Sequence, residues 1–338
     1  MVKVGIGIIG TGSIAKTYTK CIAELEQVYL VAMYTKSDIR ITEAEQLFGV
    51  PVFSNMKAFL AEATIDLVCI CNESGNHGEA IQQAALANKH VLCEKPLEVT
   101  PEKVDDAIQI CKAQNVLLGG VFQNRCEPAY QAVLKAVSEG SLGTLLMGNA
   151  YINWYRNTAY YKTNPWRGTL QLDGGAAFMN QGIHTIDLLL TIMGPVHSVF
   201  GNIKTLVHAI QGEDVGAGLI TFKNGAIGSI TAGTSLYPGY PERLEIYGEK
   251  GSIRMEGGTI IDWNVADVAA PDFNREAKSG AADPTSIGHL NHKMVLQDMV
   301  DAIFEKRRPM VDGKEARKSV ALITALYRSS QQRKEIIV

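Results

Sequence analysis

The stretch Val4-Gly5-Ile6-Gly7-Ile8-Ile9 followed by Gly10-Thr11-Gly12-Ser13-Ile14-Ala15 decides the fold. A short apolar run, typical of a buried strand, leads into a glycine-rich turn, and apolar residues at helical spacing follow the turn. The same glycine pattern also matches Gly5 to Gly10, but almost no strand precedes that match. We therefore expect the turn at Gly10 to place backbone amides and a helix N-terminus around a pyrophosphate group.

Strand and helix patterns alternate through the first 122 residues. Further apolar strand candidates lie at Val28–Tyr34, Asp66–Cys71 and His90–Cys93, and residues at helical spacing separate them. Such an alternation predicts βαβ units and a parallel sheet. The sequence therefore predicts an α/β Rossmann dinucleotide-binding domain over residues 1–122.

Residues 123–338 show a different pattern. A helix is predicted at Phe178–Met193, and strand candidates with little helix between them follow over residues 196–263. Asn224-Gly225 lies between two of these strands and is a strong hairpin signal. Residues 266–286 are rich in Ala, Asp, Pro and Gly and predict a loop. We predict a second, α+β domain whose large, mostly antiparallel open sheet carries helices on one face.

The overall composition excludes two classes of partner. The formal net charge is −3, from 32 Lys and Arg against 35 Asp and Glu, and the densest basic group is Lys306-Arg307-Arg308. A nucleic-acid-binding protein usually carries a basic face, so we expect no nucleic-acid partner. The sequence contains no run of about 18 or more apolar residues, so it predicts no membrane span. The first residues also lack a signal-peptide pattern. We therefore expect a cytoplasmic protein with no membrane partner.

The cysteines do not predict a metal site. All six lie in the first 126 residues, and they lack the clustered Cys/His spacing of zinc sites or redox pairs. We expect them to be reduced and to act as small, buried apolar residues.

Cys93-Glu94-Lys95-Pro96 is the second informative string. It follows the strand candidate His90–Cys93, and a lysine at the C-terminal end of a parallel strand faces the crevice where a doubly wound fold binds its ligand. Partial desolvation there lowers the pKa of a lysine toward neutrality, which suits it to carry a proton. Most lysines are solvated surface residues, so the prediction that Lys95 carries a proton rests on its position at the strand end.

The turn after the second strand is expected to bind the adenosine ribose. It reads Tyr34-Thr35-Lys36-Ser37-Asp38, and no carboxylate ends the strand to bind a ribose diol. The charge of Lys36 and the hydroxyl groups of Thr35 and Ser37 suit a 2′-phosphate. We therefore expect NADP(H) to be favoured, while Asp38 leaves NAD(H) open.

Further short motifs extend over nearly the whole chain: Asn76-His77, Gln123-x-Arg125, Trp166-Arg167, Gly174-Gly175, Asn180-Gln181-Gly182-Ile183-His184-x-x-Asp187 and Gly248-Glu249-Lys250-Gly251-Ser252. Together with the turn at Gly10 and Glu94-Lys95-Pro96, they resemble the Gfo/Idh/MocA oxidoreductase family, the glucose-fructose oxidoreductase and inositol dehydrogenase group. The resemblance implies hydride transfer at a sugar or cyclitol hydroxyl. It also implies that residues 123–338 bind the substrate and form a homodimer or homotetramer through the open sheet.

The resemblance also implies the catalytic groups. Lys95 and His184 would be the acid/base pair, and Asn180 would lie beside them. Positions i and i+4 of an α-helix share a face, so Asn180 and His184 are expected to point the same way. Asn180 stands where many family members have aspartate, and asparagine cannot take a proton. Asp187 is expected either to orient the histidine or to act structurally.

Further contacts are predicted on the same basis. Family members usually have Thr-Pro where this chain has Asn72-Glu73, so its cofactor contacts there should differ. The aromatic residues from Trp154 to Trp166 either stack on the sugar or pack in the core or a subunit interface. His289 and His292 lie either in the cleft or at the surface. The predicted cofactor contacts are Gly10, Thr11, Gly12, Ser13, Ile14, Thr35, Lys36, Ser37, Asn72, His77, Glu94, Lys95, Gln123, Trp166 and Arg167, and the predicted substrate contacts are Lys95, Arg125, Tyr155, Asn180 and His184.

The sequence thus predicts an NAD(P)-dependent oxidoreductase that transfers a hydride between nicotinamide and a secondary hydroxyl of a sugar, cyclitol or glycoside. One alternative is a cofactor-sensing regulatory protein on the same fold, which need not keep the lysine, so the presence of both Lys95 and His184 argues against it. Another is a nucleotide-sugar 3-dehydrogenase, because some such members carry the same Asn-Gln…His string. A diol dehydrogenase or an imine-type reductase on a Rossmann scaffold also stays open. The second half has no arginine-rich run to mark a diphosphate site, which favours a free sugar, cyclitol or simple glycoside.

Overall fold

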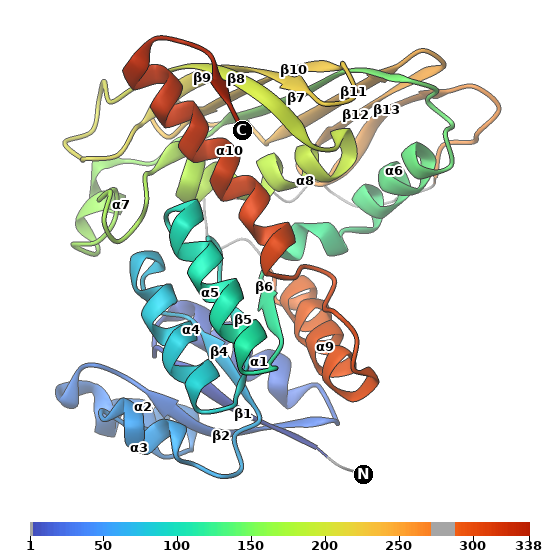
Figure 1. Ribbon diagram of the computed structural model, residues 1–338. Helices are drawn as coiled ribbons and strands as arrows, with labels where there is room; N and C mark the ends of the chain where they lie inside the picture. The colour runs from blue at the N-terminus through green and yellow to red at the C-terminus, as the bar shows by residue number, and fades with distance from the viewer. Residues whose placement is uncertain (1–2, 272–287) are drawn as a thin grey trace. The chain divides into compact units, whose positions relative to one another are not determined.

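The computed structural model describes residues 3–271 and 288–338, and the chain divides into two compact units (Figure 1). Unit 1 is the chain up to Gln123 together with His289–Arg317, and unit 2 runs from Asn124 to Gly288 and includes Lys318–Val338. The sequence places residues 289–317 in the second domain. In the structure they group with unit 1, because α9 (Leu290–Glu305) packs beside α1 (Ser13–Ala23). The loop predicted over residues 266–286 lies mostly outside the described residues.

Unit 1 contains a parallel sheet whose described strands follow the order β3-β2-β1-β4-β5-β6. The order reverses between β1 and β4, and a doubly wound sheet binds its ligand at such a point, outside the C-terminal ends of the strands. The Rossmann prediction is therefore confirmed. The strands are β1 (Val4–Ile9), β2 (Val28–Tyr34), β3 (Val52–Phe53), β4 (Leu67–Ile70), β5 (His90–Cys93) and β6 (Leu118–Gly120).

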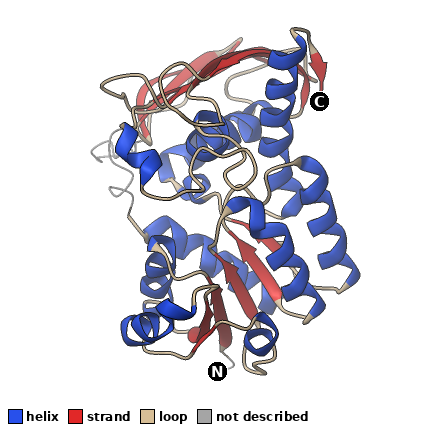
Figure 2. Cartoon of the chain, turned by 90° about the vertical axis from the view of Figure 1, so that its left-hand side faces the viewer, coloured by secondary structure: helices blue, strands red, loops and turns tan. Residues whose placement is uncertain are grey.

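Helices cover both faces of this sheet (Figure 2). Every residue of β1 and β4 is buried, as expected for parallel strands that are covered on both sides. The remaining helices of the unit are η1 (Asp38–Arg40), α2 (Ile41–Phe48), α3 (Met56–Leu60), η2 (Ser74–Asn76), α4 (His77–Leu86) and α5 (Pro101–Ala113), and η3 (Gln123–Cys126) lies at the division between the units.

Unit 2 contains a sheet whose described strands follow the order β13-β12-β11-β7-β10-β9-β8-β14. Its described pairs are antiparallel apart from β7 with β10, which confirms the predicted mostly antiparallel sheet. The strands are β7 (Leu145–Asn153), β8 (Val196–Lys204), β9 (Val215–Phe222), β10 (Ile227–Gly233), β11 (Arg243–Gly248), β12 (Gly251–Glu256), β13 (Thr259–Val265) and β14 (Ile336–Ile337).

One face of this second sheet packs against helices, and Figure 1 shows α6, α8 and α10 on that side. The other face exposes large apolar side chains, and the strand register places Met147, Phe200, Leu219 and Ile227 together on it. The helices of the unit are α6 (Pro128–Ser138), α7 (Thr158–Lys162), η4 (Ala177–Gly182), α8 (Ile183–Met193) and α10 (Gly313–Gln332), which belongs to unit 2 from Lys318 onward.

Among the residues that the structure describes, no helix combines the length and the apolar character needed to cross a membrane.

Candidate functional site

The turn between β1 and α1 provides an anion cradle. Gly10 has φ +105°, and a Cβ there would lie 2.8 Å from the carbonyl oxygen of Cys71, so the position requires glycine. Gly12 is the N-cap of α1, no described side chain caps the helix there, and a Cβ on Gly12 would meet nothing within 4 Å. Because the first amides of a helix need acceptors, this open turn fits the pyrophosphate of a dinucleotide.

The turn after β2 is shaped by Thr35. This residue is buried, and its hydroxyl oxygen accepts the N–H of Ser37 at 3.3 Å. Lys36 is exposed and Ser37 is half-buried. Thr35 therefore fixes the backbone of the turn, while Lys36 and Ser37 are accessible for contact with a ribose or its phosphate.

Glu94 and Lys95 directly follow the last residue of β5, and Glu94 is buried. Glu94 accepts the Tyr18 hydroxyl at 3.4 Å and the N–H of Lys95 at 3.3 Å. Burial raises the pKa of the Glu94 carboxyl to about 7, although the charge of Lys95 opposes the shift. The carboxyl of Glu94 is thus poised to change its charge near neutral pH, directly beside the predicted catalytic lysine.

His292 of α9 completes this cluster. Its Nε2 lies 3.8 Å from Glu94 Oε1, and its ring lies edge-on to Tyr18 with 6.2 Å between centroids. Burial, together with the positive charges of Lys95 and His289, lowers the pKa of His292 to about 4. The imidazole is therefore neutral at pH 7. The prediction of a surface position for His292 is wrong, because the residue is buried within unit 1.

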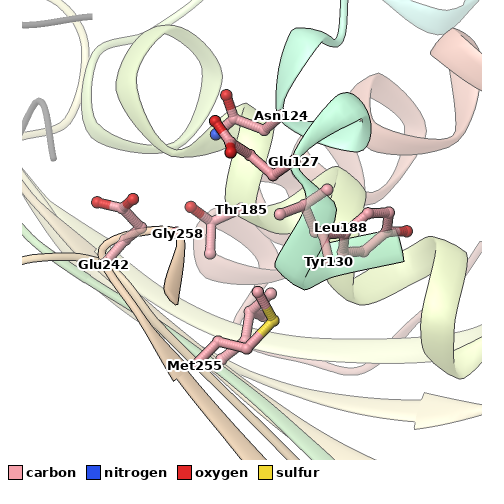
Figure 3. Close-up of a pocket in the computed structure, with 9 residues that line it drawn as sticks. Asn124, Glu127, Tyr130, Thr185, Leu188, Glu242, Met255 and Gly258 are labelled. Carbon is pink, nitrogen blue, oxygen red and sulfur yellow. The ribbon is translucent and has the colours of Figure 1, made fainter. Parts of the chain in front are cut away.

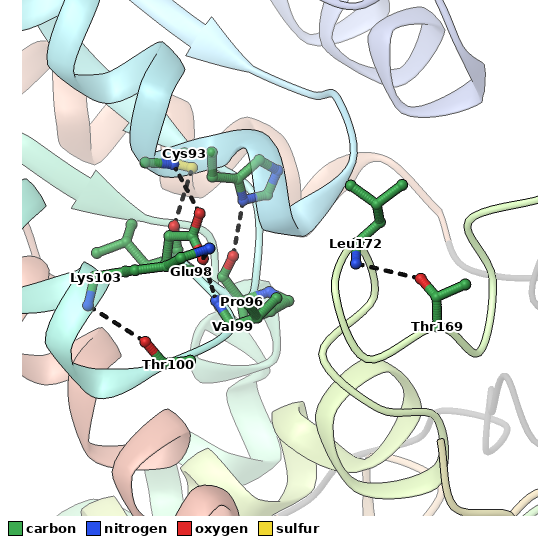
Figure 4. A network of polar contacts seen from close by, with 11 residues as sticks. Cys93, Pro96, Glu98, Val99, Thr100, Lys103, Thr169 and Leu172 are labelled. Carbon is green, nitrogen blue, oxygen red and sulfur yellow. Dashed lines mark hydrogen bonds and ion pairs between the residues drawn. The ribbon is translucent and has the colours of Figure 1, made fainter. Parts of the chain in front are cut away.

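His77 braces the backbone next to Lys95. Its Nδ1 lies 2.8 Å from the Pro96 carbonyl oxygen (Figure 4). Its Nε2 lies 3.1 Å from the Asn72 carbonyl oxygen. The side chain is buried, so the ring can act on a cofactor only through these two backbone segments. Asn72 Oδ1 is buried and has no partner among the described residues. An unsatisfied acceptor costs about 1–3 kcal/mol, and a cofactor hydroxyl would satisfy it.

Glu98 is a buried carboxylate close in sequence to Lys95, and the sequence patterns did not reveal its contacts. This buried carboxylate accepts the N–H groups of Gly78 at 3.2 Å and Val99 at 2.6 Å, and it forms an ion pair with Lys103 at 3.4 Å (Figure 4). It therefore ties the start of α4 to the segment that follows Lys95.

In unit 2 the predicted helix Phe178–Met193 is divided into two kinds of helix. η4 is a π-helix, in which the carbonyl oxygen of Ala176 accepts the N–H groups of both Asn180 and Gln181. α8 begins only at Ile183. Residues i and i+4 share a face only on a continuous α-helix, so the predicted common direction of Asn180 and His184 does not follow across this wider turn. His184 is half-buried, while the residues on either side of it are buried.

The side chain of Asn180 is held from both ends. Its amide nitrogen donates to Asp173 Oδ1, and its amide oxygen accepts from Gln181 Nε2 at 2.6 Å. Asp173 is buried and also accepts the N–H of Gly168 at 2.7 Å. A carboxylate is therefore present behind the asparagine, although it comes from a residue that the sequence motifs did not indicate.

Asp187 and Arg125 form a buried, bidentate ion pair. Arg125 Nε and Nη2 lie 2.7 Å from the two carboxylate oxygens, and Ser319 Oγ lies 3.4 Å from one of them. This partner supports the structural interpretation of Asp187. Arg125 is predicted to contact the substrate, and in the structure its guanidinium is engaged in this ion pair with Asp187.

Two guanidinium groups flank Tyr160. Arg167 lies 4.2 Å and Arg156 lies 5.6 Å from its ring centroid, and Arg167 also donates to its hydroxyl oxygen. Gln181 joins the group, because Arg156 donates to its Oε1 at 2.8 Å and its Nε2 donates to Tyr160 at 2.9 Å. The fold therefore gathers positive charge beside Asn180, which the sequence spacing did not show. Tyr155 instead packs edge-on against Tyr237, with 5.3 Å between centroids.

A small pocket adjoins α8 (Figure 3). Thr185 lines it and directly follows His184, so the pocket adjoins the helix that carries the predicted catalytic histidine. Its lining residues are Asn124, Glu127, Tyr130, Thr185, Leu188, Glu242, Leu244, Met255 and Gly258. No group of three or more His, Cys, Asp or Glu in the described part of the chain has the arrangement of a metal site, and the six cysteines are buried and unpaired.

Two family models match the chain. The model for "Oxidoreductase family, NAD-binding Rossmann fold" matches residues 4–121, and the model for the "GFO/IDH/MocA C-terminal domain" matches residues 130–254. The chain belongs to the Gfo/Idh/MocA oxidoreductase family. The family prediction is thus confirmed, and the protein is a nicotinamide-dependent dehydrogenase.

Individual relatives agree with this assignment. The chain is similar to the WlbA dehydrogenase of Bordetella pertussis, solved in complex with NADH and UDP-GlcNAcA, with 31% identity, a TM-score of 0.90 and 99% of each chain covered. The WlbA dehydrogenase of Chromobacterium violaceum, also with NADH and UDP-GlcNAcA, shares 27% identity, with a TM-score of 0.91 and 100% and 96% of the two chains covered. The myo-inositol 2-dehydrogenase of Thermotoga maritima is 28% identical over 73% of this chain and 74% of its own length. These relatives are enzymes, which argues against the regulatory alternative.

Proposed function

We propose that the protein oxidises a secondary hydroxyl of a sugar or cyclitol reversibly, with Lys95 and His184 as acid/base groups. The position of Lys95 carries the proposal. Lys95 follows β5 on the side of the sheet where the parallel strands end, and β1 ends on the same side in the turn at Gly10. The buried carboxyl of Glu94 lies beside Lys95. A proton carrier is therefore placed in the same unit as the turn that suits the cofactor.

Side chains of the protein accept and donate the proton of the reaction. The nicotinamide, when bound, accepts or returns the hydride. Lys95 in its neutral form takes the hydroxyl proton, and its ammonium form stabilises negative charge on that oxygen. His184 is the second proton carrier, since imidazole titrates near neutral pH. Asn180, fixed by Asp173, contributes hydrogen bonds but no proton transfer.

The turn Thr35–Ser37 is proposed to select the cofactor, with NADP(H) favoured over NAD(H). Lys36 is exposed in the turn, and Arg40 adds a second exposed positive charge at the end of η1. Both suit a 2′-phosphate. Asp38, which opens η1, is the carboxylate that would bind a ribose diol instead.

A second candidate substrate is a nucleotide-linked sugar. Two observations favour it: the similarity over nearly the whole chain to WlbA dehydrogenases solved with UDP-GlcNAcA, and the pair of guanidinium groups on Tyr160. Guanidinium groups bind carboxylates and phosphates well. On this proposal Arg156 and Arg167 would act on an acidic group of the substrate.

Unit 2 is also proposed to form the homodimer or homotetramer. The outer face of its sheet exposes Met147, Phe200, Leu219 and Ile227, and clustered apolar side chains of this kind mark interaction surfaces. Sedimentation equilibrium should give the mass of two or four chains, and a monomer at micromolar concentration would contradict this part.

The activity itself is tested with a substrate panel. Purified protein is mixed with NAD⁺ or NADP⁺ and with sugars, cyclitols, glycosides and nucleotide sugars, and the absorbance of reduced cofactor is followed. We expect turnover with one substrate class and with NADP⁺ preferred. Tight cofactor binding by fluorescence titration without turnover on any member would contradict the proposal.

A further inference from the structure

Glu213 anchors the start of η4. This residue lies just before β9, and its side chain is 6% exposed. Its carboxylate accepts the N–H of Phe178 at 2.8 Å and the N–H of Ala176 at 3.2 Å, and its backbone carbonyl oxygen accepts the N–H of Ala177 at 3.1 Å. The N–H groups of three consecutive residues at the start of the π-helix therefore all donate hydrogen bonds to Glu213.

Tyr327 of α10 supports this carboxylate. Its buried hydroxyl donates to Glu213 Oε1 at 2.9 Å. Gly175 has φ +141°, and a Cβ there would lie 2.2 Å from the Tyr327 hydroxyl and 2.8 Å from Glu213 Oε2. The pair of Glu213 and Tyr327 thus fills the space above Gly175, which explains why the chain has glycine at this point.

The anchor leads directly to the predicted catalytic segment. The N–H of Ala176 is bound by Glu213, and its carbonyl oxygen accepts the N–H groups of Asn180 at 3.3 Å and Gln181 at 3.1 Å. A shift of Ala176 would therefore move Asn180. It would also move His184, because α8, which carries His184 as its second residue, directly follows η4. A π-turn is an uncommon conformation, so it needs support of this kind from the surrounding structure.

We propose that Glu213, supported by Tyr327, is a positioning residue that sets the places of Asn180 and His184 for the reaction. The inference rests on the proposed function of those two residues. Burial raises the pKa of the Glu213 carboxyl, so the ionised group is costly to keep in the fold. This cost is offset by the hydrogen bonds that the carboxylate accepts from two amides of the site, those of Ala176 and Phe178, and from the Tyr327 hydroxyl.

The test compares Glu213→Gln and Tyr327→Phe with Ser330→Ala. Ser330 is on the same helix as Tyr327. Its hydroxyl accepts the N–H of Ile203 at 2.9 Å and donates to the Ile203 carbonyl oxygen at 3.3 Å, so the control also removes hydrogen bonds of α10. For Glu213→Gln we expect kcat to fall roughly tenfold, less than the hundredfold that a displacement of about 1 Å causes. Tyr327→Phe should show a smaller fall, and Ser330→Ala should keep the wild-type kcat.

Two further readouts separate positioning from general damage. The Kd for the cofactor should change little, because the predicted phosphate and ribose contacts lie in unit 1. Hydrogen exchange at the amides of residues 176–181 should quicken in both test variants and not in the control. Wild-type kcat or unchanged exchange in both test variants would overturn the inference. If the wild type shows no turnover, the proposed function fails, and the exchange measurement still decides whether Glu213 holds η4.

Discussion

Replacing Glu94 by glutamine should stabilise the protein, and increasingly so as the pH rises. The carboxyl has an ordinary pKa near 4.5, and burial raises it to about 7 in the fold. A group whose pKa is raised contributes most stability below its unfolded pKa, and this contribution is lost as the pH rises through the folded pKa. Glutamine imitates the protonated carboxyl and keeps an acceptor for Tyr18.

The size of the effect follows from the two pKa values. They differ by about 2.5, and each pKa unit corresponds to about 1.4 kcal/mol, so the ionised carboxyl costs the fold on the order of 3 kcal/mol. The free energies of unfolding of the variant and the wild type should be similar near pH 4.5. Above pH 7 the variant should be more stable by up to about 3 kcal/mol.

Urea unfolding of both proteins at several pH values between these limits measures the difference directly. Glu43→Gln on α2, an exposed carboxylate, is the matched control and should give a small difference that does not grow with pH. A wild type that gains stability over Glu94→Gln as the pH rises would contradict this prediction, because the carboxylate would then be stabilised by Lys95 more than burial penalises it.

Three other variants test separate parts of the structure. Thr35→Asp together with Lys36→Ala should shift the preference toward NAD⁺, measured as the ratio of kcat/KM for the two cofactors; an unchanged ratio would show that this turn does not select the cofactor. Arg125→Met should lower the free energy of unfolding by about 3–5 kcal/mol, because Asp187 is left buried without its ion partner; a loss under about 1 kcal/mol in urea unfolding would contradict a structural pair. Asp173→Asn should lower kcat more than it raises the KM for cofactor, since the carboxylate orients an amide of η4; steady-state kinetics with an unchanged kcat would argue against that role.

The local parts of the fold were predictable from the sequence. A strand, a glycine turn and a helix start succeed one another within residues 4–15, so β1, Gly10 and α1 could be recognised from neighbouring residues alone. Asn224-Gly225 is a second case, because Gly225 has φ +90° and joins β9 to β10 as a hairpin. In both places the residue types that the backbone requires lie within a few positions of each other.

The long-range parts of the site were not predictable in this way. Tyr327 lies 114 residues from Glu213, and His292 reaches Glu94 from a helix near the other end of the chain. No spacing rule joins such residues, because the contact exists only after the chain has folded. The arginine pair on Tyr160 is similar, since neither residue forms part of an arginine-rich run.

The π-helix shows a third kind of limit. The apolar spacing of Phe178–Met193 predicts a helix but does not distinguish a π-turn from an α-turn at its start. In the structure Glu213 binds the amides of Ala176 and Phe178 from the start of β9, and no local spacing reveals that contact. Asn180 could therefore be named as a site residue, while its orientation by Asp173 could not.

The most direct test of the central claim is the turnover of Lys95→Ala with the substrate that the panel identifies. Lys112→Ala, an exposed lysine on α5, is the matched control. We expect a loss in kcat of about a hundredfold to ten-thousandfold, the usual contribution of an acid/base group, with cofactor affinity changed little. A Lys95→Ala protein that reduces cofactor at the rate of the control would show that Lys95 is not an acid/base group of the reaction.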